Sequence, residues 1–498
     1  MPSTLELLPP ELFASILLQV HPDHLTQTAL ALIYALPGAP IAGYQLLTHI
    51  RITNPKQAVG LDLRLRKHRE DIPRIKDFKL KAWTVDADVV CNLINLLPKL
   101  TNFTLFIGPN FAPEHLEEIF TGHIEEVQTM SLRFRPYVKK ATYYQFLKGA
   151  YFDSTLRKLA QWPPSNDKPL LALSIVQDPI PEVAQKERFA QPLVFFRLDP
   201  LSELVCSKYL QSLQSFRLRI PGRQFVRYIC AQPGVLSHVE LLDVSTSMIA
   251  ESEVETLLGQ FTRLRHLILD NCNMKRLDLL DGEWAALGKS CAIAGHRRAK
   301  DREKKLREWL EAHTPQANPD EQVIQVVDAI PARRARRGRR GVAVATISLR
   351  EREEPALRPS GPSRINPNVP KIRILPSPPS LASLAITTTS YFAQQSRQDA
   401  IRADFERGWS EGLAQLNAIR SRLRQSWNNG IRVVKFSDDG SLSEDGLDGL
   451  VDVETINMSD GMALGDAPLL CLAGPGRKDG HVEGCGHALG WNIWDDDL

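Results

Sequence analysis

The chain has 498 residues, of which 43% are apolar and 24% charged, and its net charge at pH 7 is only +3. This composition excludes a chain that is disordered throughout and leaves room for two or three structural units. The small net charge gives no global signal for a nucleic-acid or membrane partner. Seven scattered cysteines predict a reducing compartment, the cytoplasm or the nucleus. The sequence has neither a long apolar run nor a basic-then-apolar leader, so we expect no membrane span and no secretory signal.

Residues 5–35 predict the first two helices. Pro9 and Pro10 suit a helix start. Apolar residues then recur at helical spacing, at Leu12, Ile16, Leu17 and Val20. The sequence His-Pro-Asp ends this helix, and Asp23 can cap the second one. On these residues alone, the pair is interpreted as a cap over the end of the structure that follows.

The same stretch resembles the opening of an F-box. The residues that carry the resemblance are Leu8, Pro9, Glu11, Leu12, Ile16, Leu17, Val20, Pro22, Asp23 and Leu25. The F-box family docks a small helical motif onto the Skp-type adaptor of a cullin–RING ubiquitin ligase. The resemblance therefore implies an F-box-like motif at residues 1–40, with adaptor contacts from Pro9, Leu12, Ile16, Leu17 and Leu25. After Leu32 the family has a basic and aromatic helix end, where this chain has a Pro- and Gly-containing segment.

From about residue 75 to 270, the pattern apolar-x-x-apolar-x-apolar recurs seven times. The units are Ile75-Phe78-Leu80, Leu100-Phe103-Leu105, Val127-Met130-Leu132, Leu170-Leu173-Ile175, Leu213-Phe216-Leu218, Val239-Leu242-Val244 and Leu264-Leu267-Leu269. The first three start 25 and 27 residues apart and the last three 26 and 25 apart, whereas both central gaps are 43. Such a period is typical of leucine-rich repeats. We therefore predict an α/β fold, an irregular leucine-rich-repeat solenoid at residues 41–313. The alternative is an ordinary α/β domain with unrelated strands.

The residues that alternate with these apolar positions should lie on the exposed, concave side of the predicted sheet. The early and middle repeats place basic residues there, namely Lys79, Lys81, Arg133, Arg135, Arg217 and Arg219. The late repeats place Asp243, Ser245 and Asp270 there. Such a field would steer an acidic or phosphorylated protein target. Basic residues can also serve only to prevent aggregation of exposed strands. Nucleic acid fits less well, because few aromatic residues are interleaved with the basic ones.

Residues 281–313 predict a helix that closes the solenoid as its C-terminal cap, with Trp284, Leu287 and Cys291 on one face.

Residues 314–389 are rich in Pro and Arg. They contain too few apolar residues to offset the entropy cost of ordering, which predicts a disordered basic linker. Its arginine cluster consists of Arg333, Arg334, Arg336, Arg337, Arg339 and Arg340. The cluster fits a nuclear-import signal, a generic basic linker or a nucleic-acid patch.

A long amphipathic helix followed by a short strand is predicted at residues 390–440. The helix has one apolar stripe, formed by Ile401, Phe405, Trp409, Leu413, Leu416, Ile419, Leu423 and Trp427. A stripe of this length must be covered, either by the solenoid or by a second copy or partner groove. Residues 441–498 predict a mostly disordered, acidic and Gly-rich tail.

The sequence contains no motif of a hydrolase, metalloprotease or nucleotide-binding enzyme. Cys471, His481, Cys485 and His487 have side chains that zinc accepts, but they lack the paired CxxC spacing of common zinc sites. We therefore expect no metal, no other cofactor and no enzymatic activity.

These patterns predict a non-catalytic, substrate-recognition subunit of a cullin–RING ubiquitin ligase. The N-terminal helices would hold the Skp-type adaptor and thereby the cullin scaffold, while the repeats would bind a protein target. A separate conjugating enzyme would then act on the target by proximity. The alternative is a leucine-rich-repeat interaction scaffold with no link to ubiquitination, and a third class is a nuclear protein that binds nucleic acid through the arginine cluster.

Overall fold

The computed structural model describes residues 4–494 apart from residues 21, 41–46, 136–151, 166, 180–193, 233, 273–281, 314–369, 388–394, 438–448, 455–465 and 477–479. Its central element is a ten-stranded sheet in the order β1-β2-β3-β4-β5-β6-β7-β8-β10-β13, with all neighbours parallel. The strands are β1 (His49–Ile52), β2 (Asp77–Leu80), β3 (Asn102–Ile107), β4 (Thr129–Phe134), β5 (Ala172–Gln177), β6 (Ser215–Arg219), β7 (Leu241–Asp243), β8 (His266–Ile268), β10 (Ser383–Ala385) and β13 (Leu469–Cys471).

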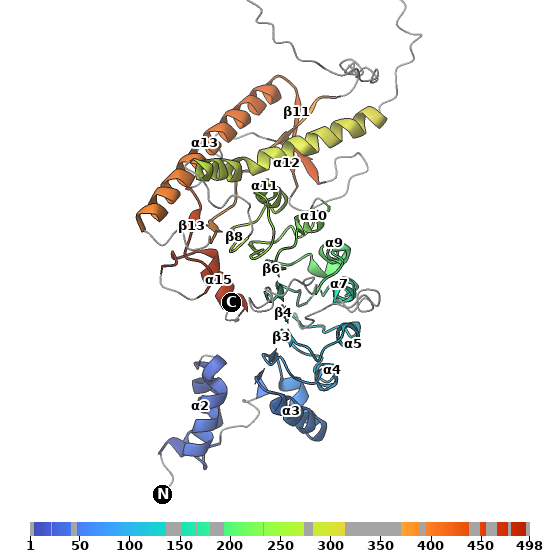
Figure 1. Ribbon diagram of the computed structural model, residues 1–498, viewed down its shortest axis with the longest axis vertical. Coiled ribbons are helices and arrows are strands. Elements are labelled where there is room, and N and C mark those ends of the chain that lie inside the picture. The colour runs from blue at the N-terminus through green and yellow to red at the C-terminus, as the bar shows by residue number, and fades with distance from the viewer. Residues whose placement is uncertain are drawn as a thin grey trace, which may run out of the picture.

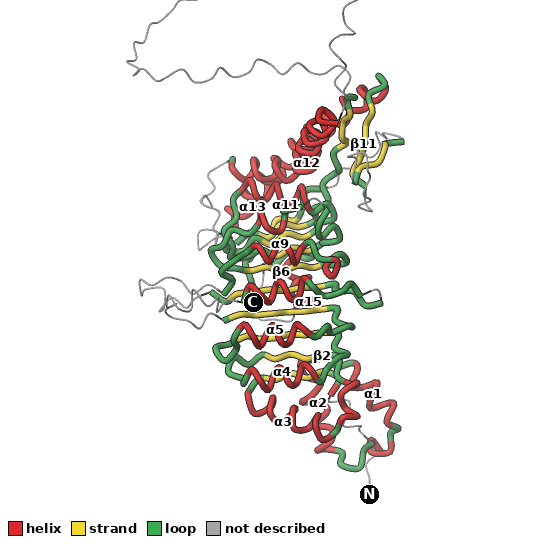
Figure 2. The backbone as a smooth tube through the Cα atoms, turned by 90° about the vertical axis from the view of Figure 1, so that its right-hand side faces the viewer, coloured by secondary structure: helices red, strands yellow, loops and turns green. Residues whose placement is uncertain are grey.

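The register of the sheet follows from the apolar pattern. The central apolar residue of each unit lies opposite that of the next unit, which aligns Phe78, Phe103, Met130, Leu173, Phe216, Leu242 and Leu267. All seven side chains are buried in one continuous core. Shifting a strand by one residue would turn its apolar side chains to the other face, so burial of one face fixes the register. Figure 2 shows the strands stacked as parallel rungs.

Helices that connect successive strands cover one face of the sheet, as Figure 1 shows for α3 to α10. They are α3 (Pro55–Lys67), α4 (Ala87–Asn95), α5 (Pro113–Thr121), α7 (Asp153–Ala160), α9 (Asp199–Val205), α10 (Val226–Ile229) and α11 (Glu251–Gln260), with 3-10 turns η3 (Arg69–Arg74) and η4 (Lys208–Leu210). Local signals set their ends: Asn54 accepts a hydrogen bond from the Gln57 amide and forms a capping box before Pro55. The main core lies between these helices and the sheet.

The prediction of an irregular leucine-rich-repeat solenoid is wrong. The chain has an α/β fold built on one ten-stranded parallel sheet, which does not end at the last repeat. Strand β10 pairs with β8, placing Ser383 opposite His266, and β13 then pairs with β10. The apolar pattern marks a strand that is buried under a helix, and any parallel sheet covered by helices needs such strands. It therefore could not distinguish a repeat array from a sheet completed by distant segments.

Two further parts of the fold prediction need correction. Strands β9 (Ile372–Leu375) and β10 lie inside residues 314–389, which were predicted to be a disordered linker. The predicted tail, residues 441–498, contains β12 (Leu450–Asp452), β13 and helix α15 (Gly486–Trp494). These elements gain their order from pairing with distant strands, which the local composition does not reveal. The three strands β12, β11 (Arg432–Phe436) and β9 form a second, smaller sheet.

The two longest helices, α12 (Glu283–His313) and α13 (Gln395–Asn428), pack against each other, and α12 also packs against α11. Figure 1 shows these two helices crossing beside α11, at the opposite end of the molecule from α3. Helix α12 was predicted as a terminal cap, but the sheet continues beyond β8 through β10 and β13. The apolar stripe of α13 is covered as a helix of this kind requires, since Ile401, Phe405 and Trp409 join the main core.

The remaining helices lie at the N-terminus and on the other face of the sheet. The 3-10 turn η1 (Thr4–Leu7) precedes α1 (Pro10–Leu18) and α2 (Pro22–Ala35). Helix α15 lies on the opposite side of the sheet from α3 to α10 and contacts β8 and β10. Among the helices that the structure describes, none combines the length and the apolar run needed to cross a bilayer.

Candidate interaction surfaces

Helices α1 and α2 hold each other through a small core of their own. Leu17 and Ala29 are buried between them, and Val20 and Leu32 pack against this pair. This cluster is distinct from the main core under the sheet. Figure 1 shows the pair beside the β1 end of the molecule and apart from α3. The helix pair therefore has its own internal packing, as a small docking motif does.

The helix pair and the 3-10 turn η1 before it concentrate exposed apolar side chains. Eleven large apolar side chains are exposed in the part of the chain that the structure describes, and six of them lie within residues 5–34. The six are Leu5, Leu7, Leu12, Ile16, Leu30 and Tyr34. Single exposed apolar residues are normal on a protein surface, but a cluster of them marks an interaction site.

The structure divides the predicted adaptor-binding residues into two groups. Leu12 and Ile16 are 46% and 47% exposed, and Pro9 is exposed beside them. Leu17, by contrast, is 2% exposed and belongs to the core of the helix pair. The side chain of Leu25 lies outside the described residues. Leu12 and Ile16 are four residues apart on α1 and thus share one face, which leaves them available to a partner.

Four of the six predicted sheet residues lie near the carboxyl ends of β2 and β4. Lys79, Lys81 and Arg133 are half-buried, and Arg135 is exposed. The Arg133 guanidinium carbon lies 5.1 Å from the centre of the Phe106 ring, and its Nε lies 2.6 Å from Oδ1 of Asp178. These interactions hold a basic surface in place at this edge of the sheet.

The Trp83 indole organises the same edge. Its ring centre lies 4.7 Å from that of Phe106, 5.7 Å from the Arg133 guanidinium carbon and 5.5 Å from that of Arg135. The sequence analysis missed Trp83 and Phe106, because neither belongs to the repeating apolar pattern. We call this group of two basic and two aromatic side chains the Trp83 cluster.

The remaining two, Arg217 and Arg219, are buried, so the prediction that they lie on an exposed surface is wrong. Each donates a hydrogen bond to Oδ2 of the fully buried Asp243, from Arg217 Nε at 3.1 Å and from Arg219 Nη2 at 2.7 Å. Burial by itself raises the pKa of Asp243, but the two arginines and the Ser245 hydroxyl outweigh it and hold that pKa well below its usual range.

Helix α15 covers this part of the sheet. The Arg217 guanidinium carbon lies 5.0 Å from the centre of the Trp494 ring. Gly486 lies against His266 and Ile268, where an added Cβ would be only 3.2 Å from the Ile268 side chain. The predicted concave surface is thus occupied, over β6 to β8, by the chain's own C-terminal helix. Sequence reasoning missed this cover because α15 follows a Gly-rich segment that was predicted to be disordered.

Metal-binding side chains come together beside α15. The ligand atoms of Cys471, His481, Cys485 and His487 all lie within 4.8 Å of one another. Burial alone raises the pKa of Cys471, but its contacts with His487, the Ala473 backbone and His481 outweigh burial and lower this pKa to about 6. Burial raises the pKa of Cys91 and Cys291 to about 12. The four residues match those identified in the sequence analysis, where their spacing argued against a metal.

The arginine cluster of Arg333 to Arg340 lies outside the described residues.

No protein-family model and no curated protein matches the chain. Among solved structures, the chain is similar to a complex of Rad7 and Elc1 in yeast, with 15% sequence identity and a TM-score of 0.29 over 52% of this chain. The match covers 52% of the other chain, so this protein spans about half the length of the structure it resembles.

Proposed function

We propose that this protein is a substrate-recognition subunit of a cullin–RING ubiquitin ligase, which binds a Skp-type adaptor through α1 and α2. The observation that carries the proposal is the exposed apolar surface of the helix pair, centred on Leu12 and Ile16. The sequence of this surface resembles an F-box opening, the motif whose apolar face docks onto such an adaptor. Two independent features, one of sequence and one of exposure, thus favour the same face of α1.

The physical argument rests on how α1 distributes its apolar residues. Leu17 stabilises the helix pair from inside, whereas Leu12 and Ile16 keep nearly half of their surface exposed to water. Fully removing a large aliphatic side chain from water contributes about 1.5–3 kcal/mol, and covering the exposed part of Leu12 or Ile16 contributes roughly half of that, which favours association. Helix α1 thus has a second apolar face, with Leu12 and Ile16, that the helix pair does not cover. A helix with such a face can bind in the apolar groove of a partner.

The Trp83 cluster supports a second contact, with the protein target. Arg135 is exposed on this edge, and arginine and tryptophan are enriched among the residues that dominate binding energy at protein interfaces. The basic charge of Lys79, Lys81 and Arg135 favours an acidic target segment. In this proposal no residue of the chain is catalytic. The protein would hold the target close to a conjugating enzyme, which converts a bimolecular encounter into a local one.

The experiment is co-purification of the full chain with a co-expressed Skp-type adaptor, comparing the wild type with Leu12→Asp plus Ile16→Asp. Both side chains are nearly half exposed in the free chain, so the substitutions should leave the fold intact. In the complex the two carboxylates would be buried without partners, at several kcal/mol. We expect the wild type to retain the adaptor and the double variant to lose it.

A matched control is available on α3. Val59 and Leu63 are also exposed apolar residues four positions apart on one helix, so Val59→Asp plus Leu63→Asp repeats the chemical change elsewhere. This control variant should bind the adaptor as the wild type does. If the wild type binds no adaptor, residues 5–35 are not a docking motif, and the protein is an interaction scaffold without a ligase.

A further inference from the structure

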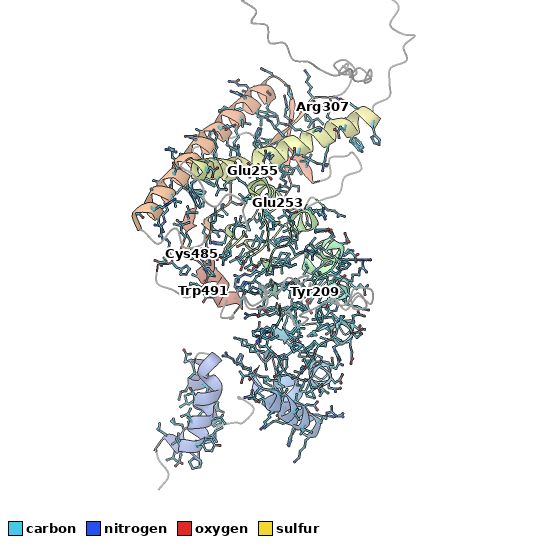
Figure 3. The ribbon with its side chains drawn as sticks, viewed as in Figure 1. Tyr209, Glu253, Glu255, Arg307, Cys485 and Trp491 are labelled. Atoms are coloured by element: carbon cyan, nitrogen blue, oxygen red, sulfur yellow. The ribbon has the colours of Figure 1, made fainter. Side chains whose placement is uncertain are left out.

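Three separate pieces of the C-terminal segment meet at one point next to the sheet. Cys471 is the last residue of β13, His481 and Cys485 belong to the following turn region, and His487 lies in the first turn of α15. Figure 3 labels Cys485 and Trp491 next to each other at α15. Two thiols and two imidazoles that converge in this way are a common ligand set of structural zinc sites.

The distances between the ligand atoms fit one tetrahedral ion. Zinc bonds of about 2.3 Å to sulfur and about 2.0 Å to nitrogen, at the tetrahedral angle, place a sulfur and a nitrogen ligand about 3.5 Å apart. Cys471 Sγ lies 3.5 Å from Nδ1 of His481 and 3.5 Å from Nδ1 of His487. Cys485 Sγ lies 3.8 and 4.0 Å from the same two nitrogens. The four atoms, which all lie within 4.8 Å of one another, therefore stand close to the separations that the ion would impose.

The outward-facing nitrogens of both histidines are hydrogen-bonded in the way a metal site requires. Nε2 of His481 lies 2.8 Å from the Gly476 carbonyl oxygen, and Nε2 of His487 lies 2.5 Å from Oδ2 of Asp270. A carbonyl oxygen can only accept, so Nε2 of His481 carries a proton, and in the neutral imidazole the lone pair of Nδ1 then points at the cluster. The carboxylate of Asp270 has the same effect on His487.

Asp270 is fully buried two residues after the end of β8, and the Thr387 hydroxyl donates to its other oxygen. Such a carboxylate–histidine pair fixes the ring orientation and makes the imidazole a better ligand. Trp491 packs its ring against the His481 ring, with the ring centres 4.7 Å apart, and so shields the cluster from one side. The donor set, the tautomers and the shielding all favour an ion at this point.

From these contacts we infer a structural zinc site whose ligands are Cys471 Sγ, His481 Nδ1, Cys485 Sγ and His487 Nδ1, with Asp270 as a positioning residue. Four protein ligands close the tetrahedron, so the ion has no position for a substrate and serves structure. Sulfur and imidazole ligands favour zinc over magnesium or calcium, which prefer oxygen.

A competing reading is a nucleophilic Cys471–His487–Asp270 triad. Cys471 is fully buried, however, and its thiol faces both histidines and the second cysteine rather than an opening to solvent. A catalytic thiol must be reached by its substrate, which this placement prevents. A second cysteine and a second histidine have no role in such a triad, whereas a zinc ion uses all four side chains.

The ion would stabilise the segment between β13 and α15, which has few apolar contacts of its own. The segment between β13 and α15 contains four glycines with positive φ, at positions 474, 476, 480 and 484. The apolar cluster under it consists only of Ile268, Ala385, Cys471 and Cys485, with two alanines packed against them. Metal binding supplies folding free energy directly to a small segment of this kind. The site would therefore clamp α15 over the buried Arg217 and Arg219.

The experiment uses the full chain, purified and dialysed against metal-free buffer, with zinc per chain measured by elemental analysis. We expect about one tightly held zinc ion per chain. Titration of the metal-stripped chain with Co²⁺ should give the strong visible bands of a tetrahedral ion with thiolate ligands. Cys471→Ser plus Cys485→Ser should abolish both signals, whereas Cys206→Ser, at an exposed cysteine far from the cluster in sequence, should leave them unchanged.

Asp270→Asn gives a test that does not remove a ligand. Loss of the outer carboxylate should weaken metal affinity by about 10- to 100-fold, because such partners orient the ligating imidazole. A wild-type chain that neither retains zinc nor gives tetrahedral Co²⁺ bands would overturn the inference. So would a Cys471→Ser plus Cys485→Ser variant that keeps its zinc, or recovery of a Cys471–Cys485 disulfide from the chain under reducing conditions.

Discussion

At the scale of single residues, one buried carboxylate organises the middle of the sheet. Asp243 accepts hydrogen bonds from Arg217, Arg219 and the Ser245 hydroxyl, and it is fully buried. A buried charge is tolerated only when paired and hydrogen-bonded, so the three side chains depend on Asp243. The sequence analysis assigned all three charged residues to an exposed surface, because strand alternation gives the face of a side chain and not what covers that face.

Asp243→Asn should destabilise the protein strongly. It removes the buried negative charge with which both Arg217 and Arg219 pair, and breaking a buried ion pair in this way costs about 3–5 kcal/mol. Urea unfolding followed by circular dichroism measures the change. The control is Asp452→Asn, which removes the partner of Arg432 in an exposed pair worth about 0–1 kcal/mol. Equal losses in the two variants would contradict the account.

The stability that Asp243 contributes should depend on pH. Its pKa in the folded protein is depressed, whereas an unfolded aspartate titrates near a pKa of about 3.9. The contribution is therefore fully present above about pH 5 and is lost progressively as the pH falls toward the folded value. The difference in stability between the wild type and Asp243→Asn should shrink between about pH 5 and pH 3. A difference that stays constant over this range would rule out an ionised Asp243.

At the scale of elements, the crossing of α12 and α13 depends on glycine. Gly288 of α12 lies against the Phe405 carbonyl, and Gly408 of α13 lies against the Ala285 carbonyl, so closely that an added Cβ would overlap each oxygen. Helix axes approach this closely only where side chains are absent. The spacing of apolar residues in the sequence predicted the stripe on α13. It did not predict that α12 is the main partner of α13, because Gly288 and Gly408 do not contribute to an apolar pattern.

Gly408→Ala should therefore destabilise the protein by about 1–3 kcal/mol, the usual effect of overpacking a well-packed contact. Gly60→Ala on α3 is the matched control. Gly60 is exposed with nothing within 4 Å of an added Cβ, so the alanine should instead stabilise its helix by about 0.5–1 kcal/mol. Thermal unfolding of both variants gives the two signs. A Gly408→Ala protein as stable as the wild type would show that the helices do not cross this closely.

Some strands of the large sheet could be predicted from the sequence, and others could not. The seven strands that pair Phe78 through Leu267 carry a repeated apolar pattern, and residue types at period two suffice to find them. Strands β10 and β13 carry the same apolar spacing once each, at Leu381-Leu384-Ile386 and Ala467-Leu470-Leu472, but far along the chain from the seven regular units. Their pairing joins Ser383 to His266, more than a hundred residues apart in the chain. An isolated occurrence of the spacing does not say which strand it pairs with, so the pairing of these two strands could not be predicted.

At the scale of the whole molecule, the chain places its two proposed interaction regions at different parts of one sheet. The α1–α2 pair lies by β1, and the Trp83 cluster lies at the ends of β2 to β4. The C-terminal segment completes the opposite end of the sheet and covers β6 to β8. The metal ligands could be found in the sequence, yet Asp270 could not be linked to them, because 217 residues separate it from His487.

The most direct test of the central claim is hydrogen exchange of the full chain with and without a purified Skp-type adaptor. Amide exchange reports, peptide by peptide, where a partner protects the backbone. We predict slower exchange in peptides from α1 and α2 when the adaptor is added, and unchanged exchange in the strands β2 to β5. Unchanged exchange in α1 and α2, or protection confined to the sheet, would contradict the assignment of this helix pair as the adaptor-docking surface.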